Sequence, residues 1–177
     1  MTNKLNIPII IGTGRDGNYT SLAATAVLDH SRTFGFDSFP VEVTNYVEGV
    51  TGQSAKKDDW NKLLATADGL LIVTPEYNHG YPGELKLALD LTQITNSLHK
   101  PVGLIGVSSG GIGGSRVVEN LKPVCLELGL LPLRSAVYFS EVNKIWPERQ
   151  LEAIPEKTNS SLLAMLTEME TLLKKLS

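Results

Sequence analysis

Short apolar runs recur along the chain, and each is followed by a segment rich in glycine or polar residues. The clearest runs span residues 7–11, 70–73, 102–107 and 131–139. A continuous apolar run bounded by turn-forming residues is typical of a strand buried on both faces. We place Pro8 at the start of the first strand, because proline is confined to strand starts, edges and bulges. Residues 39–46 predict a further short strand at or near an edge of the sheet.

Helical periodicity fills the intervals between these runs. Five helices are expected. The first follows Thr20, the second has Asp58 or Asp59 as its cap, and the third begins at Glu84. The last two span residues 116–128 and 158–176. Gly35 and Gly129 stand where the first and fourth of them are expected to end. Residues 141–155 lack periodicity and predict an irregular segment. The last helix should turn one apolar face inward, formed by Leu162, Leu163, Leu166, Met169, Leu173 and Leu176.

Five strands alternating with five helices predict one α/β domain, residues 1–177, on a five-stranded parallel sheet with helices on both faces. Right-handed crossovers fit the doubly wound strand order 2-1-3-4-5. In that order the loops after strands 1, 3 and 4 converge at the carboxyl edge of the sheet, where ligands bind.

Composition is that of an ordinary soluble domain, with 42% hydrophobic and 20% charged residues. A formal net charge of −3 and a pI of about 5.6 argue against nucleic-acid binding. No apolar run reaches membrane-spanning length, and the first residues lack the features of a signal peptide. We therefore expect a cytoplasmic protein with no membrane partner. The single cysteine, Cys125, lies on the apolar face of a predicted helix, which indicates core packing rather than a nucleophile.

The first of the three converging loops, GTGRDGNYT at residues 12–20, has the features of an anion site. Its glycines allow close approach of the backbone, and the helix that follows offers unpaired N–H groups. Arg15 adds a charge that can hold an anion through two hydrogen bonds. The spacing also fits the dinucleotide pattern G-x-G-x-x-G, but no acidic residue ends the second strand unless Glu42 or Glu48 serves. A purely structural turn is the alternative interpretation.

The other two loops also follow buried strands. Residues 74–83, TPEYNHGYPG, display polar side chains, and Glu84 then complements the dipole of the next helix. Residues 108–115, SSGGIGGS, contain four glycines and can lie flat against a ligand. Plain strand-to-helix connections are the alternative, although about two residues suffice for such a connection. A ligand with a phosphate end and a flat polar ring would use all three loops.

In these loops the chain resembles the NADPH-dependent FMN reductase family of flavodoxin-like flavin and quinone reductases. The resemblance covers nearly the whole chain and implies a flavodoxin-like three-layer sandwich. It is carried by Gly12-Thr13…Arg15, by Pro75-Glu76-Tyr77-Asn78 with Pro82-Gly83…Leu85-Lys86, and by Ser109-Gly110-Gly111…Gly113-Gly114…Arg116 with Leu128-Gly129.

The resemblance implies a set of FMN-binding residues. The phosphate would be held by Thr13, Arg15, Asn18 and Thr20, with Tyr19 from the same loop. Pro75, Glu76, Tyr77 and Asn78 would line the isoalloxazine ring, and Ser109, Gly110 and Gly111 would meet its pyrimidine edge. The chain departs from the family at Asn18 and Thr20, where serine and asparagine are usual. It departs again at Leu87 and Leu91, which replace a common asparagine and an often aromatic residue.

The activity implied by the resemblance is that of an oxidoreductase. It would take hydride from NADPH or NADH and pass electrons to a small-molecule acceptor such as a flavin or a quinone, in a ping-pong cycle. The flavin carries this chemistry, so we assign no catalytic side chain and no metal. His79 is the one candidate acid or base, because histidine titrates near neutrality. A place in the acceptor pocket or in a subunit contact is the preferred interpretation of His79.

Two other classes of function stay open. A flavodoxin-like electron carrier would bind FMN without oxidising nicotinamides, and a binding protein would use the fold without flavin. The net charge of −3 and the few aromatic residues near the loops disfavour the carrier. The family resemblance also implies a homodimer or homotetramer, for which Ile145 and Trp146 are candidate contacts. Packing of Trp146 on its own domain is the alternative.

Overall fold

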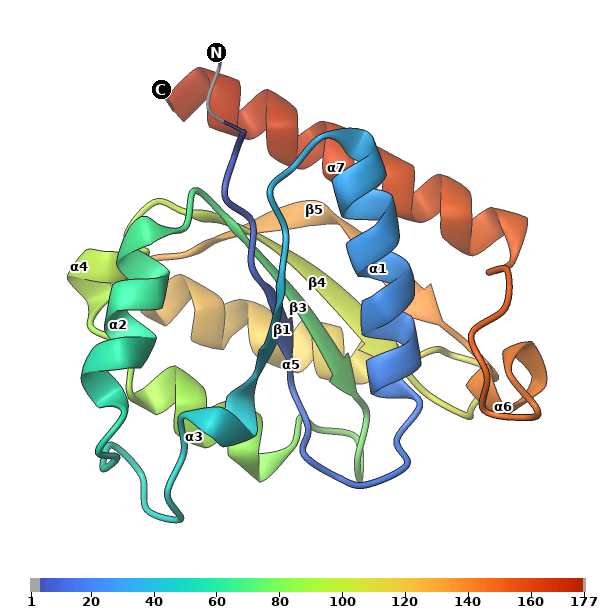
Figure 1. Cartoon of the computed structure of the whole chain (residues 1–177), viewed down its shortest axis with the longest axis horizontal. Coiled ribbons are helices and arrows are strands. Elements are labelled where there is room, and N and C mark those ends of the chain that lie inside the picture. Colours follow the sequence, from blue (N-terminus) through green and yellow to red (C-terminus); the bar gives the residue numbers. More distant parts are fainter. Residues whose placement is uncertain (1–3, 177) are drawn as a thin grey trace.

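A five-stranded sheet forms the middle layer of the structure, a computed structural model that describes residues 4–176 (Figure 1). The strands lie in the order β2-β1-β3-β4-β5, and every neighbouring pair is parallel. The predicted fold class and strand order are confirmed. The strands are β1 Ile9–Ile11, β2 Pro40–Glu42, β3 Leu70–Pro75, β4 Pro101–Val107 and β5 Leu131–Phe139.

Helices cover both faces of this sheet (Figure 1). They are α1 Thr20–Phe34, α2 Lys57–Thr66, α3 Gly83–Asp90, α4 Ile94–Ser97, α5 Ser115–Glu127, α6 Val142–Ile145 and α7 Glu156–Leu176, with a 3₁₀ turn, η1, at Val43–Asn45. Side chains of α1 and α7 form one buried cluster with Ile9 and Ile11, whereas those of α2, α3 and α5 pack with Ile10 on the opposite face. Successive residues of a strand point to opposite faces, so three isoleucines in a row serve both halves of the core. Among residues 4–176, no helix is long and apolar enough to cross a membrane.

Several element boundaries differ from the prediction. The second strand is shorter than 39–46, because the chain turns into η1 directly after Glu42. Helix α2 has Lys56 at its N-cap, so Asp58 and Asp59 lie in its first turn and not at the cap. The short helices α4 and α6 were not predicted, since four residues are too few to show a helical period.

The buried face of α7 also corrects the prediction. Leu162, Met165, Leu166 and Met169 are fully buried, at the spacing of three and four residues that keeps side chains on one face. Leu163 and Leu176, expected to point inward, are 43% and 49% exposed. Leu163 follows a buried position by a single residue, and one residue turns a helix by more than a quarter of a circle.

The sheet brings the three loops together. Gly12, the first residue after β1, donates its N–H to the carbonyl of Val73 on β3 at 2.8 Å. Glu76, the first residue after β3, donates its N–H to the carbonyl of Val107 on β4 at 3.1 Å. The loops that follow β1, β3 and β4 therefore begin side by side at the carboxyl edge of the sheet, as predicted.

Candidate functional site

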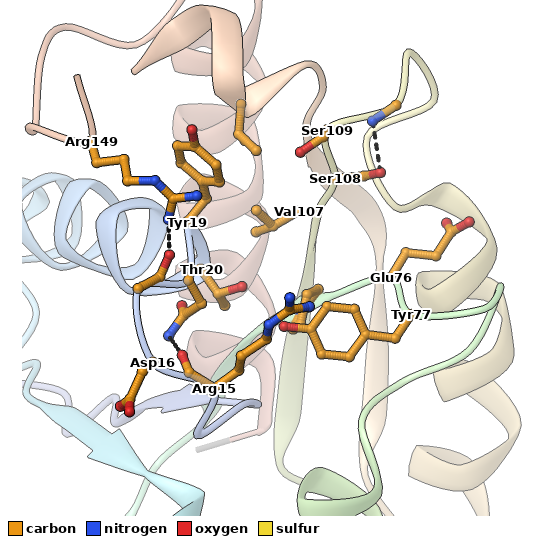
Figure 2. Close-up of a pocket in the computed structure, with 15 residues that line it drawn as sticks. Arg15, Asp16, Tyr19, Thr20, Glu76, Tyr77, Val107, Ser108, Ser109 and Arg149 are labelled. Carbon is orange, nitrogen blue, oxygen red and sulfur yellow. Dashed lines mark hydrogen bonds between the residues drawn. The ribbon is translucent and has the colours of Figure 1, made fainter. Parts of the chain in front are cut away.

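A cavity of about 440 Å³ lies between these three loops (Figure 2). Its wall is formed by Arg15, Asp16, Gly17, Asn18, Tyr19, Thr20, Pro75, Glu76, Tyr77, Val107, Ser108, Ser109, Gly110, Val142 and Arg149. Three of the residues predicted to bind cofactor, Thr13, Asn78 and Gly111, are not part of this wall. Asp16, Val142 and Arg149 are wall residues that the sequence did not single out.

Asn18 fixes the shape of the first loop. Its side-chain oxygen accepts hydrogen bonds from the backbone N–H of Ser21 at 2.8 Å and from the Ser21 hydroxyl at 3.2 Å. Its amide nitrogen donates to the carbonyl of Arg15 at 2.6 Å. The side chain thus satisfies one of the N–H groups that a helix start leaves unpaired. Asn18 holds the loop against the start of α1, next to Tyr19 and Thr20 in the cavity wall.

Thr13 is turned away from the cavity. Its side chain is 1% exposed, and its hydroxyl donates to the Glu84 carboxylate at 3.0 Å. The backbone N–H of Gly14 donates to the same carboxylate oxygen, also at 3.0 Å. Thr13 therefore joins the first loop to the start of α3.

These contacts change the acidity of Glu84. Burial raises the pKa of its carboxyl, but hydrogen bonds from its own N–H, from Gly14 and from Thr13 outweigh burial. The pKa lies below its ordinary value of 4.5. A carboxyl whose pKa is lowered in the folded state stabilises the protein at pH values above the ordinary pKa of that carboxyl. That contribution is lost as the pH falls through the lowered value.

Glu84→Gln is therefore expected to lower the free energy of unfolding at pH 7 by about 1 kcal/mol, with a difference that shrinks toward zero at acid pH. Urea unfolding of both proteins across this pH range measures the difference. Glu156→Gln, a change in the first turn of α7, is the matched control. The Glu156 carboxylate accepts a hydrogen bond from the Ser160 hydroxyl, which belongs to the same helix. A loss that stays constant from neutral to acid pH contradicts the role given to the Glu84 charge.

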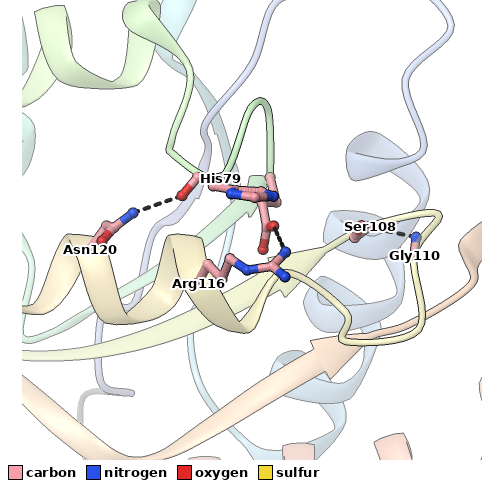
Figure 3. Close-up of polar contacts among 6 residues, drawn as sticks. His79, Ser108, Gly110, Arg116 and Asn120 are labelled. Atoms are coloured by element: carbon pink, nitrogen blue, oxygen red, sulfur yellow. Dashed lines mark hydrogen bonds and ion pairs between the residues drawn. The ribbon is translucent and has the colours of Figure 1, made fainter.

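The second loop contains a tight turn that points away from the cavity. Tyr77 and Gly80 exchange two backbone hydrogen bonds of 2.9 Å, and the residues between them, Asn78 and His79, have φ angles of 49° and 67°. Two positive φ angles in a two-residue connection are the mark of a type I′ turn. Asn78 and His79 are exposed at its tip, and the His79 carbonyl accepts a hydrogen bond from Asn120 on α5 at 2.7 Å (Figure 3).

Glu76 carries the buried charge of the site. Its side chain is 7% exposed, and one carboxylate oxygen accepts a hydrogen bond from Arg116 at 3.0 Å (Figure 3). The other oxygen, Oε2, is buried and has no hydrogen-bond partner among residues 4–176. A buried carboxylate oxygen without a partner is costly. The ion pair with Arg116 offsets part of this cost.

The third loop adds Ser108, Ser109 and Gly110 to the cavity wall. The Gly110 N–H donates to the Ser108 hydroxyl at 3.0 Å, and the Gly110 carbonyl accepts from the N–H of Glu141 at 3.2 Å. Both the N–H and the carbonyl of Gly110 are therefore hydrogen-bonded within the protein. Gly111, the next residue, is exposed and has no atom within 4 Å of an added Cβ. Within this loop the cavity wall ends at Gly110.

Two arginines stack on the two aromatic rings of the wall (Figure 2). The Arg15 guanidinium lies over the Tyr77 ring, 5.8 Å from its centroid. The Arg149 guanidinium lies over the Tyr19 ring at 4.5 Å and donates a hydrogen bond to the Gly17 carbonyl. Arg149 belongs to the segment expected to be irregular. A single arginine in a polar stretch gives no sequence signal for a binding site.

Trp146 corrects the predicted subunit contact. Its side chain is fully buried within this chain and stacks on Phe139, with ring centroids 5.7 Å apart. Ile145 is half-buried against the same core cluster. Trp146 is therefore an internal anchor, which removes it from the candidate contacts.

Cys125 is buried, as predicted, and its burial raises the pKa of the thiol to about 12. A thiol with this pKa stays protonated at neutral pH and is a poor nucleophile. Cys125 contributes to core packing on α5.

Comparison with known proteins places the chain in a family. The family described as NADPH-dependent FMN reductase matches residues 5–144. The quinone reductase of Escherichia coli (strain K12) is 28% identical over 179 residues, which cover 94% of each chain. The FMN-dependent NADPH-azoreductase of Staphylococcus saprophyticus is 30% identical over 152 residues, covering 77% of this chain and 79% of that relative.

A solved structure shares the fold over almost its full length. FerB from Paracoccus denitrificans, a flavoenzyme NAD(P)H:(acceptor) oxidoreductase, has a TM-score of 0.76 with this chain. The superposition covers 97% of this chain and 98% of FerB, at 19% identity. The shared architecture is the flavodoxin-like one that the 2-1-3-4-5 strand order indicates.

Proposed function

Because the chain belongs to the NADPH-dependent FMN reductase family, we propose that it binds FMN in the cavity between the three loops. It is an oxidoreductase that passes reducing equivalents from NADPH or NADH to a small-molecule acceptor. Quinones, free flavins and azo compounds are the acceptor classes that the names of its relatives suggest.

The observation that carries the proposal is the chemistry of the cavity wall. One end, at residues 16–20 with Arg149, offers hydroxyl, amide and guanidinium donors suited to a phosphate. The other end offers Tyr77 and residues 108–110, which suit a flat ring. A flavin mononucleotide carries both a phosphate and a flat ring, so the residues present fit it.

Bound FMN would supply the redox chemistry, namely acceptance of hydride from a reduced nicotinamide and transfer of electrons to the acceptor. The residues of the chain bind and orient the cofactor. Tyr77 and the backbone of residues 108–110 present a ring-sized wall, and Arg116 holds the Glu76 carboxylate in place. We assign no general acid or base, because hydride transfer to a flavin needs none from the protein. His79 lies outside the cavity wall, which agrees with this assignment.

We also propose a cytoplasmic homodimer or homotetramer. The support is a shallow hollow beside the Glu76 end, formed by His79, Ser115, Arg116, Glu119 and Asn120. A second subunit placed there would add a wall to the cavity.

The test is the absorbance spectrum of protein mixed with FMN, passed through gel filtration and then treated with NADPH without oxygen. We expect the flavin to stay with the protein and to bleach on addition of NADPH. Retained colour that resists NADPH and NADH indicates an electron carrier and contradicts the enzyme. No retained colour contradicts FMN binding. The same column run reports assembly, and elution at the mass of a monomer overturns the proposed oligomer.

A further inference from the structure

We propose that Arg149 makes this site selective for a phosphomonoester, namely the 5′-phosphate of FMN, so that FMN binds in preference to riboflavin. The inference rests on the proposed function. It assigns a specificity-determining role to a residue that lies beyond the family-matched residues 5–144.

The position of Arg149 is the first argument. It reaches the cavity from the segment between α6 and α7 and covers the Tyr19 ring, 4.5 Å from its centroid (Figure 2). One of its nitrogens donates to the Gly17 carbonyl. Arg149 thereby places a positive charge against the loop expected to hold the phosphate.

The position of Arg15 is the second argument. The sequence assigns the phosphate to Arg15, but this side chain extends across the cavity toward Tyr77 (Figure 2). Asp16 adds a negative charge to the same loop. The cation stacked at the Gly17–Tyr19 part of the wall is therefore Arg149.

The backbone supplies the third argument. Arg149 has a φ of 53°, a left-handed conformation that is unfavourable for a non-glycine residue. A hydrogen bond holds this conformation. The Arg149 N–H donates to the carbonyl of the buried Trp146 at 3.0 Å. The Trp146 indole in turn donates to the Glu152 carbonyl at 3.2 Å. Strained residues that the surrounding structure holds in place cluster at binding sites, which supports a binding role for the Arg149 side chain.

The chemistry follows from the guanidinium group. It has five N–H donors in a planar fork, of which the Gly17 carbonyl uses one. The remaining donors match the oxygens of a phosphomonoester, which carries nearly two negative charges at neutral pH. Riboflavin has the same ring and lacks this group, so only FMN gains from Arg149.

The experiment compares FMN and riboflavin binding to the wild type, Arg149→Gly and Arg15→Gln by quenching of flavin fluorescence. Glycine adopts a φ of 53° without strain, so Arg149→Gly removes the side chain and spares the turn. We expect this variant to bind FMN about 10- to 100-fold more weakly and riboflavin as the wild type does. We expect Arg15→Gln to change the FMN-to-riboflavin ratio less than Arg149→Gly does.

Other outcomes overturn the inference. Equal weakening of both flavins by Arg149→Gly shows a purely structural role, and unchanged FMN binding shows no role. The 2′-phosphate of NADPH is another phosphomonoester, so the rates of flavin reduction by NADPH and NADH are also compared. A changed NADPH preference with unchanged FMN affinity assigns Arg149 to the nicotinamide cofactor instead. Failure of the wild type to bind either flavin defeats the proposed function itself, and that result is distinct from the others.

Discussion

Replacing Trp146 by alanine is expected to lower the free energy of unfolding by about 3–5 kcal/mol, the usual cost of truncating a fully buried tryptophan. The side chain is completely buried and stacks on Phe139, 5.7 Å between centroids. Its removal leaves a void and frees the Glu152 carbonyl from its hydrogen bond with the indole. Urea unfolding at pH 7 measures the loss.

Trp146→Phe is the matched control. Phenylalanine keeps a ring against Phe139 but cannot donate to the Glu152 carbonyl, so a smaller loss is expected. Because Trp146 anchors the turn that carries Arg149, Trp146→Ala should also weaken FMN binding under conditions where the variant is folded. An alanine variant as stable as the wild type would show that this segment is not anchored as the structure indicates.

Gly114→Ala is expected to cost about 3 kcal/mol of stability. Gly114 precedes α5 with a φ of 81°, a conformation that L side chains rarely adopt. An added Cβ would lie 2.9 Å from the backbone nitrogen of Val107 and 3.0 Å from the Cα of Gly106. Both atoms belong to the backbone of the interior strand β4, so the clash cannot be relieved by rotating a side chain.

Gly111→Ala, in the same loop, is the control for this prediction. An added Cβ there meets nothing within 4 Å, and Gly111 is not one of the glycines with positive φ. Its effect is expected to stay within about 0.5 kcal/mol, as for other exposed substitutions. Thermal unfolding of both variants checks the contrast. Equal losses would mean that the loop tolerates neither change and that the tight packing at Gly114 is not the cause.

The middle of the sheet could be predicted because β1, β3 and β4 are buried on both faces. Strands such as β3 and β4 are uninterrupted apolar runs, and parallel connections allow few arrangements of five of them. The meeting of the three loops follows directly from that order. Short helices such as α4 and α6 escape a period-based prediction, since a single turn shows no repeat.

The wall of the cavity was only partly predictable, because loop sequences do not reveal where side chains point. Thr13 lies in a promising loop, yet its hydroxyl is bound to Glu84, a residue about 70 positions away in sequence. Asn78 follows the wall residue Tyr77, but the type I′ turn carries it to the surface. Arg149 enters the site because Trp146 packs on Phe139, a tertiary contact with no local pattern.

The most direct test of the site is a crystal structure of the protein with FMN. We predict the phosphate against residues 15–20 within reach of Arg149, and the ring between Tyr77 and residues 108–110. FMN bound elsewhere on the protein, or in this cavity with the phosphate at the Glu76 end, would contradict the account.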